Sequence, residues 1–137
     1  MSRLSKLSIS TTFLYLLMYN NVTSANTVQI ISADLHNNSS NIWSISVTLK
    51  HEDKGWEHFA DTWRVVSAKG DMLGKRVLYH PHENEQPFTR SLAGIHVPKA
   101  MKVIYIEAHD KVHGWSEKRL KIDLNKAVNG RLTVNAK

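Results

Sequence analysis

Six of the eight histidines in this chain fall in three short polar segments, at residues 51–61, 80–88 and 109–116. Each segment also contains carboxylate side chains, and the chain contains no cysteine. Imidazole and carboxylate groups bind divalent transition metals, whereas a chain without cysteine has no thiolate ligand to offer. The three segments therefore predict one histidine-rich binding site, provided that the fold brings them together.

The second and third segments supply the predicted metal ligands. His80 and His82 are separated by one proline, and in an extended backbone they lie on the same side, about 6.5 Å apart along the chain. Two imidazole nitrogens at that separation can converge on one metal at about 2.0–2.1 Å each. In the third segment His109 and His113 flank Asp110, which could bind the metal or orient an imidazole. We predict His80, His82, His109 and His113 as ligands of zinc, copper, nickel or iron.

Five residues are predicted to support this site, as ligands of lower rank or as hydrogen-bond partners: Asp110, Glu83, His51, His58 and Arg90. Arg90 is expected to pair with Glu83 or Glu85 and so to hold the central loop. Trp56 and Trp115 lie in the loops, where they either cover the loop or contact a partner. The two histidines outside the three segments are expected to have no role in the site.

The elements that must position these residues are predicted to be strands. Residues 42–50 alternate strictly between an apolar and a polar face, which is typical of a half-buried strand. Two adjacent apolar residues, Ile30 and Ile31, interrupt the alternation of the first strand and indicate a bulge. Seven strands at roughly ten-residue spacing are predicted at residues 28–35, 42–50, 62–66, 72–79, 88–92, 102–108 and 119–124, with a last short pairing at 132–134 and no helix.

This pattern predicts an all-β fold, a single immunoglobulin-like antiparallel β-sandwich of about seven strands. An eight-stranded barrel is the alternative. In such a sandwich consecutive strands reverse direction, so the connections after the second, fourth and sixth strands leave the same end. Those connections are the three histidine-bearing segments, which we therefore expect to meet at one end of the domain.

Residues 1–25 predict an export signal, with a positively charged start, an apolar run at residues 13–18 and small residues before a cleavage site after Ala25. The apolar run is shorter than the roughly 20 residues that a membrane helix needs, although a retained membrane anchor remains the alternative. A lipid anchor is not expected, because no cysteine follows the run. The mature protein is then one domain, residues 26–137, located in the periplasm or secreted, with no membrane span.

The charge of the chain argues against a nucleic-acid partner. Removal of the export signal takes away two positive charges and lowers the formal net charge from +6 to +4. A nucleic-acid-binding protein usually shows a basic cluster and a recognisable motif, and the sequence contains neither. The expected partner is a protein or a small ligand.

Three stretches resemble a family of uncharacterised, small exported bacterial β-sandwich proteins, namely residues 56–63, residues 80–92 (HPHENEQPFTRSL) and residues 109–114 (HDKVHG). The likeness runs from about residue 28 to residue 124 and implies the sandwich fold without an activity. Residues 110–115 also resemble the Cys-x-x-His-Gly segment of superoxide reductase, an immunoglobulin-like barrel, with Asp110 at the position of the cysteine ligand. That resemblance implies imidazoles on loops at one end of the sandwich, but a centre without the thiolate that drives the chemistry.

Three functions follow from these observations. The leading hypothesis is an exported β-sandwich protein that binds a divalent transition metal through its histidine-rich end. The second is a non-catalytic adhesion or accessory module without metal, which would use Trp56, Trp115 and Arg90 as contacts. The third is a metal-dependent redox enzyme; the sequence contains no serine or cysteine nucleophile motif that would indicate another kind of catalysis.

Overall fold

The computed structural model describes residues 26–137 as nine strands in two antiparallel sheets. The first sheet contains, in spatial order, β5 (Phe88–His96), β2 (Ile42–Lys50), β1 (Gln29–Ser39) and β9 (Arg131–Asn135). The second contains β4 (Met72–Val77), β3 (Ala60–Val66) and β6 (Val103–Asp110), and both β7 (Gly114–Trp115) and β8 (Leu120–Asp123) pair with the far edge of β6. A short 3-10 helix, η1, spans Leu124–Lys126. The predicted export signal, residues 1–25, lies outside the described residues.

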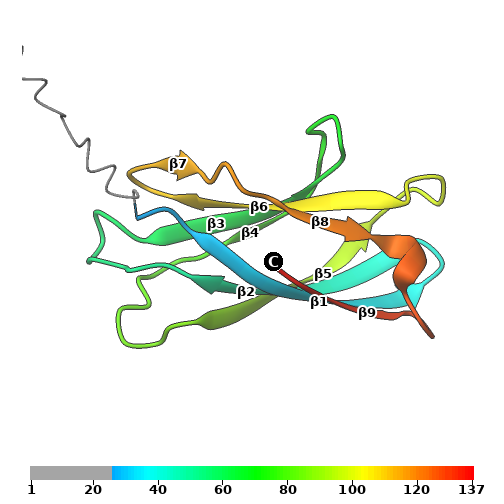
Figure 1. Cartoon of the computed structure of the whole chain (residues 1–137), viewed down its shortest axis with the longest axis horizontal. Coiled ribbons are helices and arrows are strands. Elements are labelled where there is room, and N and C mark those ends of the chain that lie inside the picture. Colours follow the sequence, from blue (N-terminus) through cyan, green and yellow to red (C-terminus); the bar gives the residue numbers. More distant parts are fainter. Residues whose placement is uncertain (1–25) are drawn as a thin grey trace, which may run out of the picture.

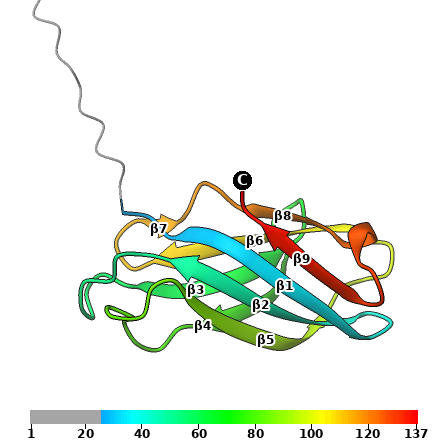
Figure 2. The same cartoon turned by 60° about the horizontal axis from the view of Figure 1, so that its bottom comes forward.

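The two sheets pack face to face as two layers (Figures 1 and 2). In each sheet, the alternate strand positions that carry apolar side chains face the other sheet and form a shared core. Trp43 and Leu49 of β2 are buried in it together with Trp63 of β3 and Ile106 of β6. The strands pair within two separate sheets, so the all-β sandwich is confirmed and the eight-stranded barrel is not observed. The immunoglobulin-like connectivity stays a prediction, which the pairing of β2 with β5 and of β3 with β6 supports.

Most predicted strands are present with small changes at their ends. The predicted bulge is confirmed, because the pairing of β1 with β2 shifts register between Ile30 and Ser32. β5 is longer than predicted, β6 continues two residues further to Asp110, and β7 lies inside the segment predicted as the third loop. The fifth and sixth strands are predicted to end at the apolar residues Leu92 and Ala108, whereas the backbone pairing continues to polar positions, and β4 ends at Val77, two residues before its predicted end.

The three histidine-bearing segments meet at one end of the sandwich, on the left in Figure 1, as predicted. The Gly55 N–H in the β2–β3 loop donates to Glu83 Oε1 of the β4–β5 loop at 2.5 Å. The Lys111 ammonium in the β6–β7 turn donates to the Trp56 carbonyl at 3.0 Å. Within residues 26–137 the structure has no helix with the length and hydrophobicity needed to cross a membrane.

Candidate metal centre

Two strand ends deliver buried polar side chains to the space between the loops. The alternate positions of β2 that face the core continue past Leu49 to His51. Those of β6 continue past Ala108 to Asp110. Neither the His51 nor the Asp110 side chain is exposed to solvent. His58 joins them from the β2–β3 loop, where the Lys54 N–H donates to its carbonyl at 2.7 Å and closes a turn.

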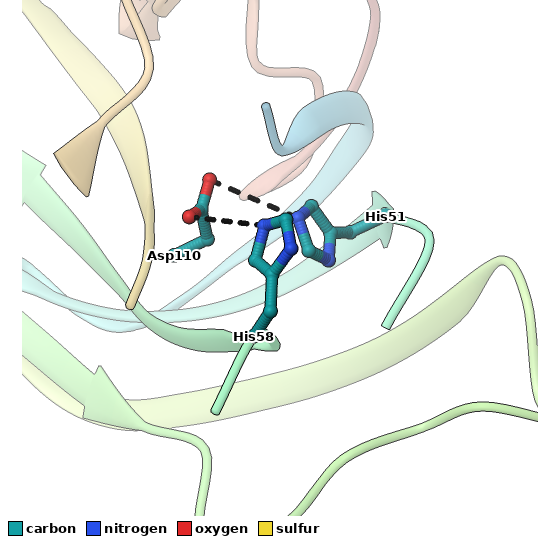
Figure 3. A group of neighbouring side chains, drawn as sticks. All are labelled: His51, His58 and Asp110. Carbon is teal, nitrogen blue, oxygen red and sulfur yellow. Dashed lines mark ion pairs between the residues drawn. The ribbon is translucent and has the colours of Figure 1, made fainter. Parts of the chain in front are cut away.

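His51, His58 and Asp110 surround a common point (Figure 3). His51 Nε2 lies 3.7 Å from Asp110 Oδ2, and His58 Nε2 lies 3.4 Å from Asp110 Oδ1. These distances are longer than N–H···O hydrogen bonds, which span about 2.7–3.2 Å. Two ligands of one tetrahedral metal, each at about 2.1 Å from it, lie about 3.4 Å apart. Since one ligand atom from each of the three residues lies within 4.8 Å of the others, the group could hold a metal ion.

Two buried atoms of this cluster have no hydrogen-bond partner, His58 Nε2 and Asp110 Oδ2. A buried polar atom without a partner costs about 1–3 kcal/mol, so native proteins rarely leave one unless something else satisfies it. Here the two unpartnered atoms belong to residues that face each other. A cation bound by both residues could satisfy these two atoms.

Asp53 fixes the orientation of His51. Its Oδ1 lies 2.6 Å from His51 Nδ1 and also accepts the Ala60 N–H, while its Oδ2 accepts the His82 N–H at 2.7 Å. His51 therefore carries a proton on Nδ1, and its Nε2 faces Asp110 Oδ2 and, at 3.1 Å, the main-chain oxygen of Asn26. A carboxylate that holds the far nitrogen of an imidazole is a common feature of metal-bound histidines.

Asp110 is held by the turn that follows it. Its Oδ1 accepts the main-chain N–H groups of Val112 at 2.9 Å and His113 at 2.7 Å, which leaves Oδ2 directed into the cluster. The His113 ring borders the cluster on the solvent side, with Nδ1 3.3 Å from Asp110 Oδ1 and its centroid 5.0 Å from that of His58. Of the four residues predicted as ligands, His113 is the one that contacts Asp110.

His109 lies on the opposite face of β6 from Asp110. Because successive side chains of a strand alternate, the inward position of Asp110 places His109 outside the sandwich. There its Nδ1 lies 2.5 Å from Asp61 Oδ1 and its ring packs against Trp115, with centroids 4.9 Å apart. The Arg64 guanidinium covers the Trp115 ring at 3.6 Å.

His80 and His82 lie side by side, with ring centroids 4.5 Å apart, but His82 is engaged elsewhere. Its ring stacks on Phe88 with centroids 4.0 Å apart, and Arg90 donates to its Nε2 at 2.9 Å. An arginine can only donate, so His82 Nε2 is an acceptor and does not face a metal. Arg90 also pairs with Glu85 at 3.5 Å, as predicted, while Glu83 binds Gly55 instead.

The environment of His82 gives a testable pH dependence. Burial lowers the pKa of His82, and the positive charges of Arg90 and His80 lower it further against the opposing effects of Asp53 and Glu85. As the pH falls below about 6.5, the unfolded chain binds this proton before the folded chain does, so His82 lowers the free energy of unfolding there. We expect NMR titration to give a His82 pKa below 6.5, and Arg90→Met to raise it. An unchanged pKa in Arg90→Met would show that the guanidinium does not act on this ring.

Within residues 26–137 the cluster of His51, His58 and Asp110 is the one group of three or more potential ligands that lie this close. All three had been predicted as supporting residues. Trp56 of the neighbouring loop is 65% exposed, and it lines a surface pocket with His80 and Glu83.

Comparisons with known proteins give one informative relative. A protein of Halomicrobium mukohataei named "Putative lipoprotein" is 41% identical over 78 residues, which cover 57% of this chain and 38% of that protein. The match therefore spans well under two thirds of the relative. No family model and no solved structure matches this chain.

Proposed function

We propose that this protein is an exported β-sandwich protein that binds one divalent transition metal through His51, His58 and Asp110. The observation that carries the proposal is the pair of buried, unpartnered atoms, His58 Nε2 and Asp110 Oδ2, beside a His51 Nε2 that also faces an oxygen. A cation at this point would satisfy all of them. The side chains of His51 and Asp110 are not exposed to solvent, and that of His58 is 18% exposed.

Two imidazoles and one carboxylate suit zinc, copper, nickel or iron. Three protein ligands leave at least one coordination position for another group. His113 lies at the rim and could fill that position by a small movement of its ring. If the position stays open, a small ligand could bind the metal there, which a metal-dependent enzyme would also require.

Export is part of the proposal. The predicted signal at residues 1–25 supports it, and the name of the Halomicrobium mukohataei relative, a lipoprotein, is consistent with a protein of the cell envelope. In a periplasmic or secreted location, the protein would take its metal from outside the cytosol.

The test is metal analysis of protein purified without a histidine tag. We expect close to one transition metal ion per chain, lost in His51→Ala and in His58→Ala. His80→Ala and His96→Ala are the matched controls, because His80 lies outside the cluster and His96 lies at the end of β5, on the opposite end of the sandwich. Retention of the metal in both cluster variants would reject the proposed site.

The exposed apolar residues of the same end favour a second candidate, an interaction module without metal. Trp56, Tyr79 and Val112 are 65%, 75% and 59% exposed, and all three lie in or beside the histidine-bearing loops. Such residues are common at protein interfaces. A purified protein that contains no metal, and whose melting temperature ignores added zinc and copper, would favour this function.

A further inference from the structure

Asn26 is fastened to the β2–β3 loop beside the proposed metal. Its side-chain amide donates to the Glu52 carbonyl at 2.8 Å, and its side-chain oxygen accepts the Glu52 N–H at 3.3 Å. Its main-chain oxygen lies 3.1 Å from His51 Nε2. Val28, two residues later, is buried in the core and anchors the segment from the other side.

These contacts place the backbone nitrogen of Asn26 near the cluster of His51, His58 and Asp110. The backbone nitrogen and carbonyl oxygen of one residue are separated by three bonds and lie at most about 3.6 Å apart. The nitrogen therefore lies within about 6.7 Å of His51 Nε2, the sum of this separation and the 3.1 Å contact of the carbonyl oxygen. In the unprocessed chain it belongs to a peptide bond, and its lone pair is delocalised and unavailable to a metal.

The predicted cleavage site lies at this residue. A signal peptidase that uses water to hydrolyse the Ala25–Asn26 bond leaves a carboxylate on Ala25 and a primary amine on Asn26. The amine nitrogen and the carbonyl oxygen of the same residue can bind one metal together and close a five-membered chelate ring. Both atoms would then come from a residue whose side chain is already fixed.

We propose that removal of the export signal completes the metal centre, with the α-amine and main-chain oxygen of Asn26 as additional ligands beside His51, His58 and Asp110. This inference rests on the proposed function and deepens it. The precursor, which lacks the amine, then binds the metal more weakly than the processed protein. Tight binding is thereby coupled to export.

The experiment compares two products exported from full-length precursors. The first precursor is the natural chain, and the second carries one threonine inserted after Ala25, so that cleavage after Ala25 leaves a residue in front of Asn26. Mass spectrometry establishes the first residue of each product, and equal melting temperatures without metal establish equal folding. We expect the extended product to bind zinc at least tenfold more weakly in a chelator competition, and its cobalt(II) complex to show an altered absorption spectrum.

Two further results separate this inference from the proposed function. If both products bind zinc equally and His51→Ala abolishes binding in each, the amine is not a ligand and the site of His51, His58 and Asp110 stands. If His51→Ala leaves zinc binding unchanged in both, the proposed function fails. A natural product that begins at a residue other than Asn26 also overturns the role of the amine.

Discussion

Zinc at a hundredfold excess over its dissociation constant will raise the free energy of unfolding of the wild-type protein by about 2.7 kcal/mol, and Asp110→Asn will remove this effect. For a domain of this size the stabilisation corresponds to a rise in melting temperature of roughly 10 °C. Asp110 is the residue to change because its buried carboxylate faces both histidines, with Oδ1 toward His58 and the unpartnered Oδ2 toward His51 (Figure 3).

The same variant has an unusual expected stability without metal. Its side-chain oxygen can still accept the N–H groups of Val112 and His113, and its new amide can donate toward His51 Nε2. Metal-free Asp110→Asn should therefore be as stable as the wild type or more stable, by about 1 kcal/mol. Asp110→Ala leaves both N–H groups without an acceptor, so its free energy of unfolding should instead fall by about 1–3 kcal/mol.

Urea denaturation of both variants with and without zinc measures these quantities. A zinc response that persists in Asp110→Asn would mean that the carboxylate is not a ligand. A metal-free Asp110→Asn that is clearly less stable than the wild type would mean that the buried carboxylate stabilises the fold by itself, without a cation.

Asp53→Asn will weaken zinc binding by 10- to 100-fold, the usual effect of removing a group that orients a metal-bound histidine. Asp53 accepts hydrogen bonds from His51 Nδ1, from the Ala60 N–H and from the His82 N–H, and an asparagine can accept with only one of its two side-chain atoms. At least one of the three donors loses its partner, which should also cost about 1–3 kcal/mol of stability.

The chain supplies a matched control for Asp53, because it contains a second His–Asp pair on the outer face of the sandwich. His109 and Asp61 are each about a quarter exposed, whereas His51 and Asp53 are fully buried. Asp61→Asn should leave zinc affinity unchanged in an isothermal titration. Equal losses in the two variants would show that the effect of Asp53 is general destabilisation rather than orientation of His51.

The strands and their order along the chain could be predicted from the sequence because alternation of apolar and polar residues reports burial directly. The same alternation could also have predicted two central residues of the candidate site, His51 and Asp110. Trp43, Ile45, Val47 and Leu49 share one phase of β2, and His51 is the next position in that phase. The predicted bounds of this strand, residues 42–50, match β2, but assigning His51 to the loop hid this continuation, and ending the sixth strand at Ala108 likewise left out Asp110.

Other parts of the site depend on contacts that no local pattern reports. His58 reaches the cluster through the turn between Lys54 and His58, and Asp53 binds His82 across 29 positions of the sequence. His80 and His82 have the spacing expected of a ligand pair, but Arg90 of β5 donates a hydrogen bond to His82 Nε2, which is then not free to bind a metal. Such pairings are set by how the loops fold against one another, which composition and spacing do not determine.

The two strands that end at the cluster belong to different layers. β2 lies in the first sheet and leads into His51, while β6 lies in the second and ends at Asp110. An ion bound by both would staple the layers together, as the inter-sheet disulfide does in antibody domains. In a chain without cysteine, a chelator would then act as a reducing agent does on those domains, and it would loosen this end of the sandwich first.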